Sequence, residues 1–391
     1  MSRTGVETKL PWKQVPKAVR QQVDRALGAP VTRATRIWGG YGPTPTYRLV
    51  LEDGRRAFLK GTFQDSNAFM KNALLSEERV YQDLAPVLGK WMPRLYATFH
   101  YDDWHVLILE DLGPQSVPPW TSGETRAITH ALAAFHQSSL GAQPPVWLSQ
   151  PDEELAQEDW TRTAHESQEL QTIAALAGAE AQQAVEWLRK ISPTIEHAMK
   201  QPALKDGPYA ILHGDLRSDN LRFNHGQLYL FDWPSISLGR PEWDIVAFAQ
   251  SVAVEKGPSP EQVMTWYGEQ FPLHTDAVES ALAWWLTFFA QRAWQPEVPG
   301  LPRLRRFQRQ QLGILIGLAQ LHPNLKNTGR KCGGGLREYR GRRAGAGRPA
   351  PRRKEWILTG QRSTAAPGDQ YIHWLWMPPS GVVQAAQERV R

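Results

Sequence analysis

The sequence has little cysteine and no long apolar run. Its single cysteine, Cys332, excludes an intrachain disulfide and any metal cluster built on several cysteines. The polar amino terminus does not resemble a secretory signal, and the longest apolar stretches, such as residues 281–290, fall short of the about 18 residues that span a bilayer. We therefore expect a soluble protein of a reducing compartment such as the cytoplasm, with no membrane partner.

The sequence also lacks an excess of positive or negative charge that extends over the whole chain. The chain has a formal net charge of +6, but residues 326–391 alone hold 14 Lys and Arg against 4 Asp and Glu. Residues 1–325 therefore hold 31 basic and 35 acidic side chains. Nucleic-acid binding is consequently not expected of the main body, and stays an alternative only for the tail, where Gly/Arg-rich runs can contact phosphates.

The length predicts two lobes, or one domain with appendages, because single cores stop growing at about 250–300 residues and the chain has 391. With 41% hydrophobic and 21% charged residues, the composition is that of an ordinary globular protein. The patterns divide the chain into a helical extension (1–30), a strand-rich lobe (31–110), a mostly helical lobe (111–323) and a basic Gly/Arg/Pro-rich tail (324–391). We expect the tail to be disordered, or not to be native coding sequence.

Local patterns indicate an α+β protein. The dipeptide Asp53-Gly54 lies between two alternating stretches and predicts a hairpin with a two-residue turn. Alternation predicts strands over residues 34–39, 46–52, 55–60, 95–100, 105–110, 209–212 and 228–231. Helical spacing predicts helices over residues 15–27, 67–84, 125–139, 152–176, 179–199, 277–294 and 301–321, with another from Asp244. The first five strands would form a small antiparallel sheet with one helix.

Polar residues that can carry chemistry gather in residues 209–233. An apolar run ends at His213-Gly214-Asp215, Asn220 follows five residues later, and a second apolar strand ends at Asp232. Carboxylate and amide oxygens beside strand ends could bind a hard cation, and Mg²⁺ prefers such ligands and shares its shell with phosphates.

This pattern, His213-Gly214-Asp215 with Asn220 and then Asp232-Trp233, resembles the catalytic and metal-binding loops of the aminoglycoside phosphotransferase and choline kinase family. The resemblance implies a bilobal, protein-kinase-like fold with a small antiparallel-sheet lobe and a larger, mostly helical lobe. It also implies that Asp215 accepts the proton of an acceptor hydroxyl, while Asn220 and Asp232 hold Mg²⁺ on ATP.

Three neighbouring residues gain roles from the same resemblance. Arg217 would contact the transferring phosphoryl group, although it could equally pair with Asp219 or face solvent. His213 would be structural, with its ring bonded to backbone near Asp232. Asp244 matches an aspartate that braces the catalytic loop in this fold, and capping of the following helix is an alternative that does not exclude this role.

The strand-rich lobe contains a candidate phosphate-binding pair. Lys60 ends the third expected strand, and Glu77 lies in the next helix, four residues before Tyr81. The resemblance implies that Glu77 fixes the Lys60 ammonium against the α- and β-phosphates of ATP. Two alternatives stay open: Glu78 competes with Glu77, and a lysine at a strand end can simply be solvated.

Two further segments would complete a nucleotide site. Gly40 and Gly42 lie in WGGYGPTPTY between the first two expected strands, where this fold covers the ATP phosphates. They do not spell the protein-kinase glycine motif, no Walker A motif occurs, and a plain glycine turn is the alternative. The stretch from Glu110 to Leu112 resembles the hinge, whose backbone would hold adenine.

The acceptor is not encoded in any clear pattern. Acidic residues over 152–159 could attract a cationic aminoglycoside or form a solvated helix face. An aromatic group could cage a quaternary ammonium or form core: Trp284, Trp285, Phe288, Phe289 and Trp294. We expect ATP- and Mg²⁺-dependent phosphorylation of a hydroxyl on a small molecule, an aminoglycoside-like antibiotic or a metabolite. The alternatives are a choline or amino-alcohol kinase and an inactive kinase-like scaffold.

A protein kinase is disfavoured by spacing. Its activation segment would end in Ala-Pro-Glu after Asp232, but only about ten residues separate Asp232 from the helix expected at Asp244. The sequence gives no indication of the oligomeric state.

Overall fold

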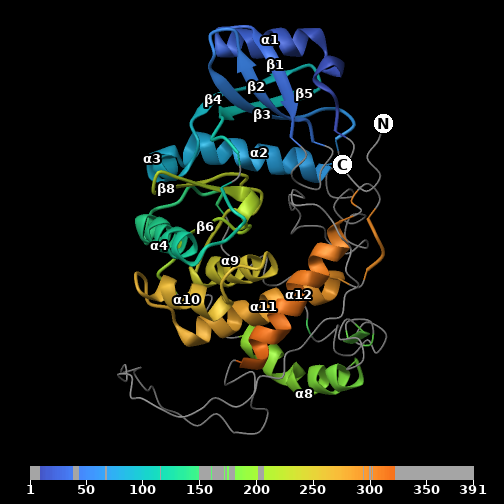
Figure 1. Cartoon of the computed structure of the whole chain (residues 1–391), viewed down its shortest axis with the longest axis vertical. Helices are drawn as coiled ribbons and strands as arrows, with labels where there is room; N and C mark the ends of the chain where they lie inside the picture. The colour runs from blue at the N-terminus through green and yellow to red at the C-terminus, as the bar shows by residue number, and fades with distance from the viewer. Residues whose placement is uncertain are drawn as a thin grey trace.

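The computed structural model describes residues 9–37, 44–66, 68–114, 116–148, 160, 171, 174–175, 181–200, 207–293, 295–298, 301 and 303–321. The described part forms a sheet-containing lobe above a helical lobe (Figure 1). Several predictions lie outside the described residues: Gly40 and Gly42, the acidic residues over 152–159, Trp294 and the tail 324–391.

The upper lobe is built on a five-stranded antiparallel sheet in the order β1-β2-β3-β5-β4. Its strands are β1 (Val31–Arg36), β2 (Thr46–Leu51), β3 (Arg56–Thr62), β4 (Leu95–Tyr101) and β5 (Trp104–Glu110). All five predicted strands are confirmed, with corrected bounds. β1 begins at Val31, three residues before the predicted start, and ends at Arg36. β3 continues past Lys60 to Thr62, and the β2–β3 connection spans residues 52–55, in which Gly54 alone has a positive φ (82°).

Helices cover both faces of this sheet. Helix α1 (Lys17–Leu27) follows a short 3₁₀ turn (Trp12–Gln14) and buries Val19, Val23 and Leu27 against one face. Because side chains alternate across a strand, β5 turns Val106 and Ile108 toward this helix, so α1 packs into one apolar cluster with the sheet.

Helix α2 (Ala68–Asp83) covers the opposite face and lies between the sheet and the lower lobe (Figure 1). The alternate β5 residues, Leu107 and Leu109, belong to the same apolar cluster as Leu74 and Val80 of α2. The short helix α3 (Ala85–Leu88) and a 3₁₀ turn (Gly89–Trp91) then lead to β4. The apolar cluster continues into the lower lobe, so the two lobes share one core.

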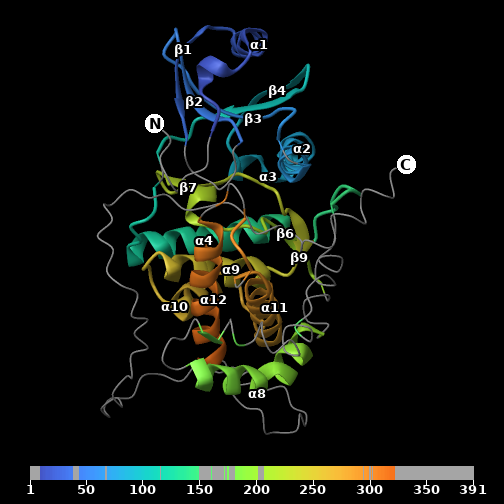
Figure 2. The ribbon, with the colours of Figure 1, turned by 90° about the vertical axis from the view of Figure 1, so that its right-hand side faces the viewer.

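The lower lobe is mainly helical. Its helices are α4 (Ser122–Ser139), α8 (Ala181–Met199), α9 (Glu242–Val254), α10 (Pro260–Gly268), α11 (Thr275–Ala293) and α12 (Leu304–Leu321). Two strand pairs, β6 (Ala210–Leu212) with β9 (Ser237–Gly239) and β7 (Leu221–Asn224) with β8 (Gln227–Leu230), lie beneath α2. Both ribbon views place α8 at the end farthest from the sheet (Figures 1 and 2).

The aromatic residues of α11 form core. Trp284, Trp285, Phe288 and Phe289 are each 1% exposed and pack against one another and, through the two tryptophans, against Trp243 of α9. A cage for a quaternary ammonium needs an open face, which these four residues do not offer. The core interpretation of this group is therefore confirmed for its described members.

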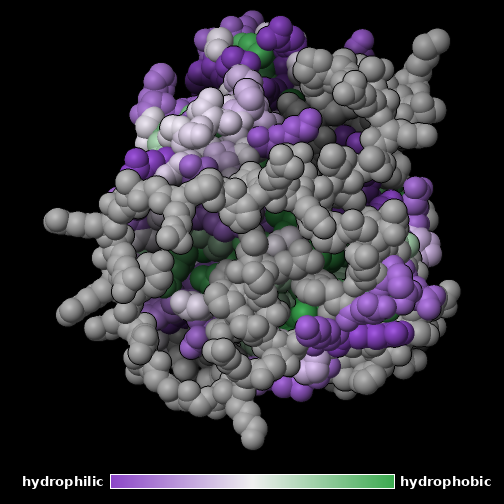
Figure 3. All heavy atoms as spheres, turned by 60° about the horizontal axis from the view of Figure 1, so that its bottom comes forward, coloured by the Kyte–Doolittle hydropathy of each residue, from purple (hydrophilic) through white to green (hydrophobic). Residues whose placement is uncertain are grey.

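One face of the molecule is largely polar where it is described. On the face seen in Figure 3, hydrophilic residues predominate among the coloured atoms, and hydrophobic residues show only as small separate areas. Among the described residues, no helix has the length and the hydropathy that a membrane crossing requires.

Candidate active site

The loop after β6 is held by a buried aspartate. The apolar strand β6 ends where His213 begins a turn, and the backbone N–H groups of His213 and Gly214 donate to the Asp244 carboxylate at 2.7 and 2.9 Å. Gly214 has a φ of 76°, and a Cβ there would lie 2.2 Å from the carbonyl oxygen of Ser235. Only glycine fits this position, so the loop geometry depends on both Gly214 and Asp244.

Asp244 braces the loop as predicted, but it does not cap its helix. Helix α9 begins at Glu242, its N-cap residue is Pro241, and Asp244 is the third helical residue. The capping alternative is therefore wrong, because the helix begins two residues earlier than the sequence pattern indicated. The first-turn position still suits a carboxylate, which interacts favourably with the helix dipole.

His213 is structural, as the sequence suggested. Its Nε2 donates to the carbonyl oxygen of Phe231 at 3.1 Å, and its Nδ1 accepts from the Asp215 N–H at 3.2 Å. Burial lowers the pKa of His213, although the carboxylates of Asp244 and Asp215 oppose this effect. A neutral ring matches these partners, since Nδ1 must be unprotonated to accept a hydrogen bond.

Asp215 is almost fully buried and its carboxylate is fixed from two sides. The Asn220 side-chain amide donates to Asp215 Oδ2 at 2.9 Å and to the Asp215 carbonyl oxygen at 2.8 Å, and Arg217 Nε lies 3.1 Å from Oδ1. Both partners of the amide are acceptors, which determines its orientation. Asn220 Oδ1 is therefore left buried and without a hydrogen-bond partner among the described residues.

Arg217 is enclosed rather than solvated. Its guanidinium contacts Asp215 at 3.1 Å and Asp219 at 3.3 Å, and lies over the Phe307 ring at 5.2 Å from the centroid. The side chain is 5% exposed. Of the two alternatives for Arg217, the pairing with Asp219 is present, and exposure of the side chain to solvent is not. The contact of Arg217 with Asp215 was not predicted from the sequence.

Lys60 joins the two lobes at the site. Phe58 and Lys60 share the β3 face that α2 covers, so the Lys60 ammonium reaches Glu77 Oε2 and Oε1 at 2.9 and 3.1 Å, and Asp232 Oδ1 at 3.3 Å. The partner is Glu77 and not Glu78. Lys60 is 12% exposed, which excludes the solvated alternative.

The protonation of this trio follows from its surroundings. Burial lowers the pKa of Lys60, but the carboxylates of Asp232 and Glu77 together outweigh it and raise that pKa above its ordinary value. Burial raises the pKa of Glu77, which the ammonium of Lys60 counteracts. The ammonium form of Lys60 is therefore the one that the site favours.

Asp232 has an unusual backbone. Its φ of 67° lies in the left-handed region, which non-glycine residues rarely occupy. The Asp232 N–H donates to Glu77 Oε1 at 3.1 Å, and the next carbonyl, of Trp233, accepts from Ser76 Oγ at 3.2 Å. Helix α2 thus holds the backbone of this loop directly.

The expected hinge follows β5. The Glu110 N–H donates to the Arg94 carbonyl at 2.8 Å, and the Leu112 carbonyl accepts from Asn224 Nδ2 at 3.0 Å. Because these two groups are engaged within the chain, adenine binding by residues 110–112 stays a prediction that rests on the other backbone groups. Asp111 between them pairs with Arg48 at 2.9 Å and ties the segment to β2.

Two supports of the loop were missed from the sequence. His136 of α4 lies between the Tyr267 hydroxyl at 2.7 Å and Asp244 Oδ2 at 3.2 Å, and all three side chains are buried. Glu255 accepts from Ser218 Oγ at 2.6 Å, beside Asn220 in the loop. No local motif marks these residues, because their partners lie 30 or more positions away in the chain.

The family follows from comparison with known proteins. The sequence model of the phosphotransferase enzyme family matches residues 33–271, which is more than half of the chain. The chain belongs to this family. A comparison with curated proteins found no match. Family membership and the fold together support small-molecule phosphotransfer as the class of activity.

Solved structures agree on the fold. The aminoglycoside phosphotransferase of Alicyclobacillus acidocaldarius superposes with a TM-score of 0.51 at 13% identity, covering 81% of this chain and 98% of its own. An aminoglycoside-3'-phosphotransferase of type VIII has a TM-score of 0.45 at 20% identity, covering 68% of this chain and 97% of its own. The choline kinase LicA of Streptococcus pneumoniae has a TM-score of 0.47 at 15% identity, covering 76% of this chain and 98% of its own. The superposition with the Alicyclobacillus enzyme shows that the fold is the protein-kinase-like α+β fold of that phosphotransferase.

Proposed function

We propose that this family member transfers the γ-phosphoryl group of ATP to a hydroxyl of a small molecule, with Asp215 as the catalytic base. The observation that carries the proposal is the convergence of residues from distant segments at one place between the lobes. Lys60 of β3 contacts Glu77 of α2 and Asp232 of the loop after β8, while the loop after β6 fixes Asp215 against Asn220.

The chain's own residues account for positioning. Lys60 would hold the α- and β-phosphates while Glu77 keeps its ammonium in place, and the Asp215 carboxylate would orient the acceptor hydroxyl and accept its proton. Arg217 and Asn220 restrict that carboxylate to one orientation. Arg217 is also close enough to the base for the proposed contact with the transferring phosphoryl group.

Asn220 and Asp232 would hold Mg²⁺. Both offer oxygen donors, which Mg²⁺ prefers, and the buried Oδ1 of Asn220 lacks a hydrogen-bond partner among the described residues, which fits a metal ligand. When bound, Mg²⁺ would neutralise phosphate charge. Glu77 orients Asp232 by accepting a hydrogen bond from its backbone N–H, and Asp215 orients Asn220 by accepting from its side-chain amide.

For the acceptor we propose an aminoglycoside-like antibiotic or a hydroxylated metabolite. The solved structure that superposes with a TM-score of 0.51 is an aminoglycoside phosphotransferase. The aromatic residues of α11 that could have favoured a choline-type substrate are packed as core. The retention of Lys60, Asp215, Asn220 and Asp232 in one arrangement argues against an inactive scaffold.

The test is Mg²⁺-dependent release of ADP from ATP across aminoglycosides, macrolides, amino alcohols and sugars. With an acceptor found, Asp215→Ala is expected to lower kcat by roughly 10²–10⁴, the usual loss for a general base. Nucleotide binding, measured by calorimetry, should be kept. Asp276→Ala, an exposed aspartate at the start of α11, serves as the control with unchanged turnover. Near-normal turnover in Asp215→Ala would contradict the assignment of the base, and absence of nucleotide binding by the wild-type protein would favour the scaffold.

A further inference from the structure

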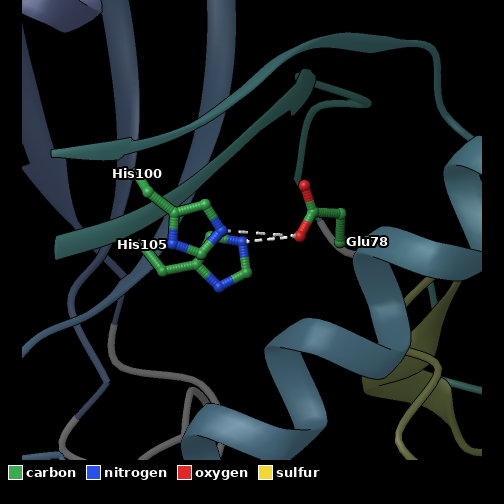
Figure 4. Close-up of side chains that lie close together, drawn as sticks. All are labelled: Glu78, His100 and His105. Carbon is green, nitrogen blue, oxygen red and sulfur yellow. Dashed lines mark ion pairs between the residues drawn. The ribbon is translucent and has the colours of Figure 1, made fainter.

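A second group of ionisable side chains lies on the outer part of the sheet lobe. Glu78 projects from α2 toward His100 and His105 of the β4–β5 hairpin (Figure 4). The two histidines are directly opposite each other in the strand register, so their side chains share one face. This is the face that α2 covers, because His105 lies two and four residues before Leu107 and Leu109 of β5, and side chains at every second position of a strand share one face.

We propose that Glu78, His100 and His105 form a binding site for a divalent cation with the ligand preferences of zinc. The Glu78 Oε2 atom lies 2.9 Å from His105 Nε2 and 4.0 Å from His100 Nε2, and one ligand atom from each residue lies within 4.8 Å of the other two. The imidazole rings stack with centroids 4.1 Å apart and 13° between planes, and the two Nε2 atoms face the same carboxylate (Figure 4).

The partners of each group favour a cation. The His105 side chain is 8% exposed, and its Nε2 has no hydrogen-bond partner among the described residues, since the short contact with Glu78 lacks hydrogen-bond geometry. A buried nitrogen without a hydrogen-bond partner lowers the stability of the fold, and coordination to a metal ion would supply the missing partner. The other Glu78 oxygen, Oε1, accepts from Thr98 Oγ1 at 2.8 Å, which turns Oε2 toward the histidines. Such outer hydrogen bonds commonly orient metal-bound carboxylates.

The ligand chemistry selects the class of cation. Two imidazole nitrogens and one carboxylate oxygen suit Zn²⁺ and related transition-metal ions, whereas Mg²⁺ and Ca²⁺ prefer all-oxygen sites. Zn–N and Zn–O bonds of about 2.0–2.2 Å require a modest approach of the ligands. His100 can make this approach because its side chain is 62% exposed, and solvent could fill a fourth position.

The cation would connect the hairpin to the helix that carries Glu77. Glu78 is the next residue along α2, and Glu77 fixes Lys60. A bridge from β4 and β5 to Glu78 would therefore restrain α2 against the sheet on which Lys60 lies. This role is independent of which acceptor the protein phosphorylates.

The experiment titrates the full-length protein with Zn²⁺ by calorimetry in excess Mg²⁺, and with Co²⁺ by visible absorption. The wild type is expected to take up Zn²⁺ at this site, to show tetrahedral-type Co²⁺ bands and to gain thermal stability on Zn²⁺ addition. His100→Ala and Glu78→Gln should each weaken that uptake by at least the roughly 10–100-fold that loss of an outer-sphere partner costs. His130→Ala is the matched control, because His130 also contacts one carboxylate, Glu269, at 2.9 Å but has no second histidine there among the described residues.

The outcomes separate cleanly. Uptake that is weakened in His100→Ala and unchanged in His130→Ala supports the site. No Zn²⁺ uptake by the wild type, or equal uptake by the wild type and His100→Ala, overturns it. Should Glu78→Gln fail to fold, His100→Ala alone decides the question, because the exposed His100 side chain contributes little packing.

Discussion

At the scale of single residues, one ammonium is shared by two carboxylates. Lys60 lies 2.9 Å from Glu77 and 3.3 Å from Asp232, and both carboxylates are largely buried. Without the lysine the two acidic groups would face each other in a poorly solvated site, where like charges raise each other's pKa. Lys60 therefore stabilises the folded protein by neutralising these carboxylates, even in the absence of nucleotide.

A double-mutant cycle measures the interaction free energy between Lys60 and Glu77. Lys60→Met should lower the free energy of unfolding, because it leaves two carboxylates buried without their cation, a change that typically costs about 3–5 kcal/mol. Glu77→Gln should lower it less, because Asp232 still pairs with the Lys60 ammonium. The double variant should be less destabilised than the sum, with a coupling of about 0.5–3 kcal/mol in urea unfolding. The exposed pair Arg55–Asp53, at 2.6 Å, is the control and should couple much more weakly. Additive effects at Lys60 and Glu77 would contradict the pairing.

The sequence predicted the members of the site better than their contacts. Asp215, Asn220 and Asp232 could be picked out because they lie close together in the sequence and their oxygen donors suit a metal ion, and Lys60 because it ends an expected strand. Which of Glu77 and Glu78 faces Lys60 could not be decided, since it depends on how α2 is rotated against the sheet. The contact of Arg217 with Asp215 was equally out of reach, because it depends on a side-chain conformation set by packing on Phe307.

At the scale of elements, the start of α9 positions the end of β6. Asp244 receives two backbone N–H groups from the loop that carries Asp215, and His136 of α4 contacts the same carboxylate. The helix therefore acts on the candidate base through the backbone geometry of the loop that carries it.

Replacing Asp244 by asparagine should disturb that geometry. The amide would present N–H groups to at least one backbone donor, leaving it unsatisfied at a cost of roughly 1–3 kcal/mol. We expect lower stability in thermal unfolding, and reduced kcat with little change in the affinity for nucleotide. Asp276→Asn, at an exposed first-turn position of α11, should change neither quantity. Unaltered stability in Asp244→Asn would show that the loop does not rely on this carboxylate.

Long elements were predictable, whereas short ones were predicted only where an apolar run marks them, as at β6 and β8. Helices α2, α4, α11 and α12 span four to five turns, so their apolar periodicity is clear in the sequence. The three-residue strand β9 has no periodicity of its own and exists because it pairs with β6. The nine-residue helix α10 begins with a Ser259 cap and Pro260, a start signal that was available and overlooked.

At the scale of the whole molecule, the described core ends before the basic tail. The last core residue is Ala319 on α12, and every candidate site residue lies between Gly40 and Asp232. Deletion of residues 326–391 is therefore expected to leave thermal stability and phosphotransfer close to those of the full chain. Melting temperature and kcat of the truncated protein check this expectation, and a folded but inactive truncation would refute it.

The core shared by the two lobes has a consequence for dividing the gene. Leu74 and Val80 of α2 pack in one cluster with Ile128 and Leu132 of α4. A polypeptide cut at the hinge would present these leucines and valines to water, and the isolated sheet half would aggregate rather than persist as a small module. Two halves produced together, however, could bury these apolar side chains against each other along α2. The chain is therefore suited to fragment complementation, an assay in which reassembly of two fragments shows that they have met.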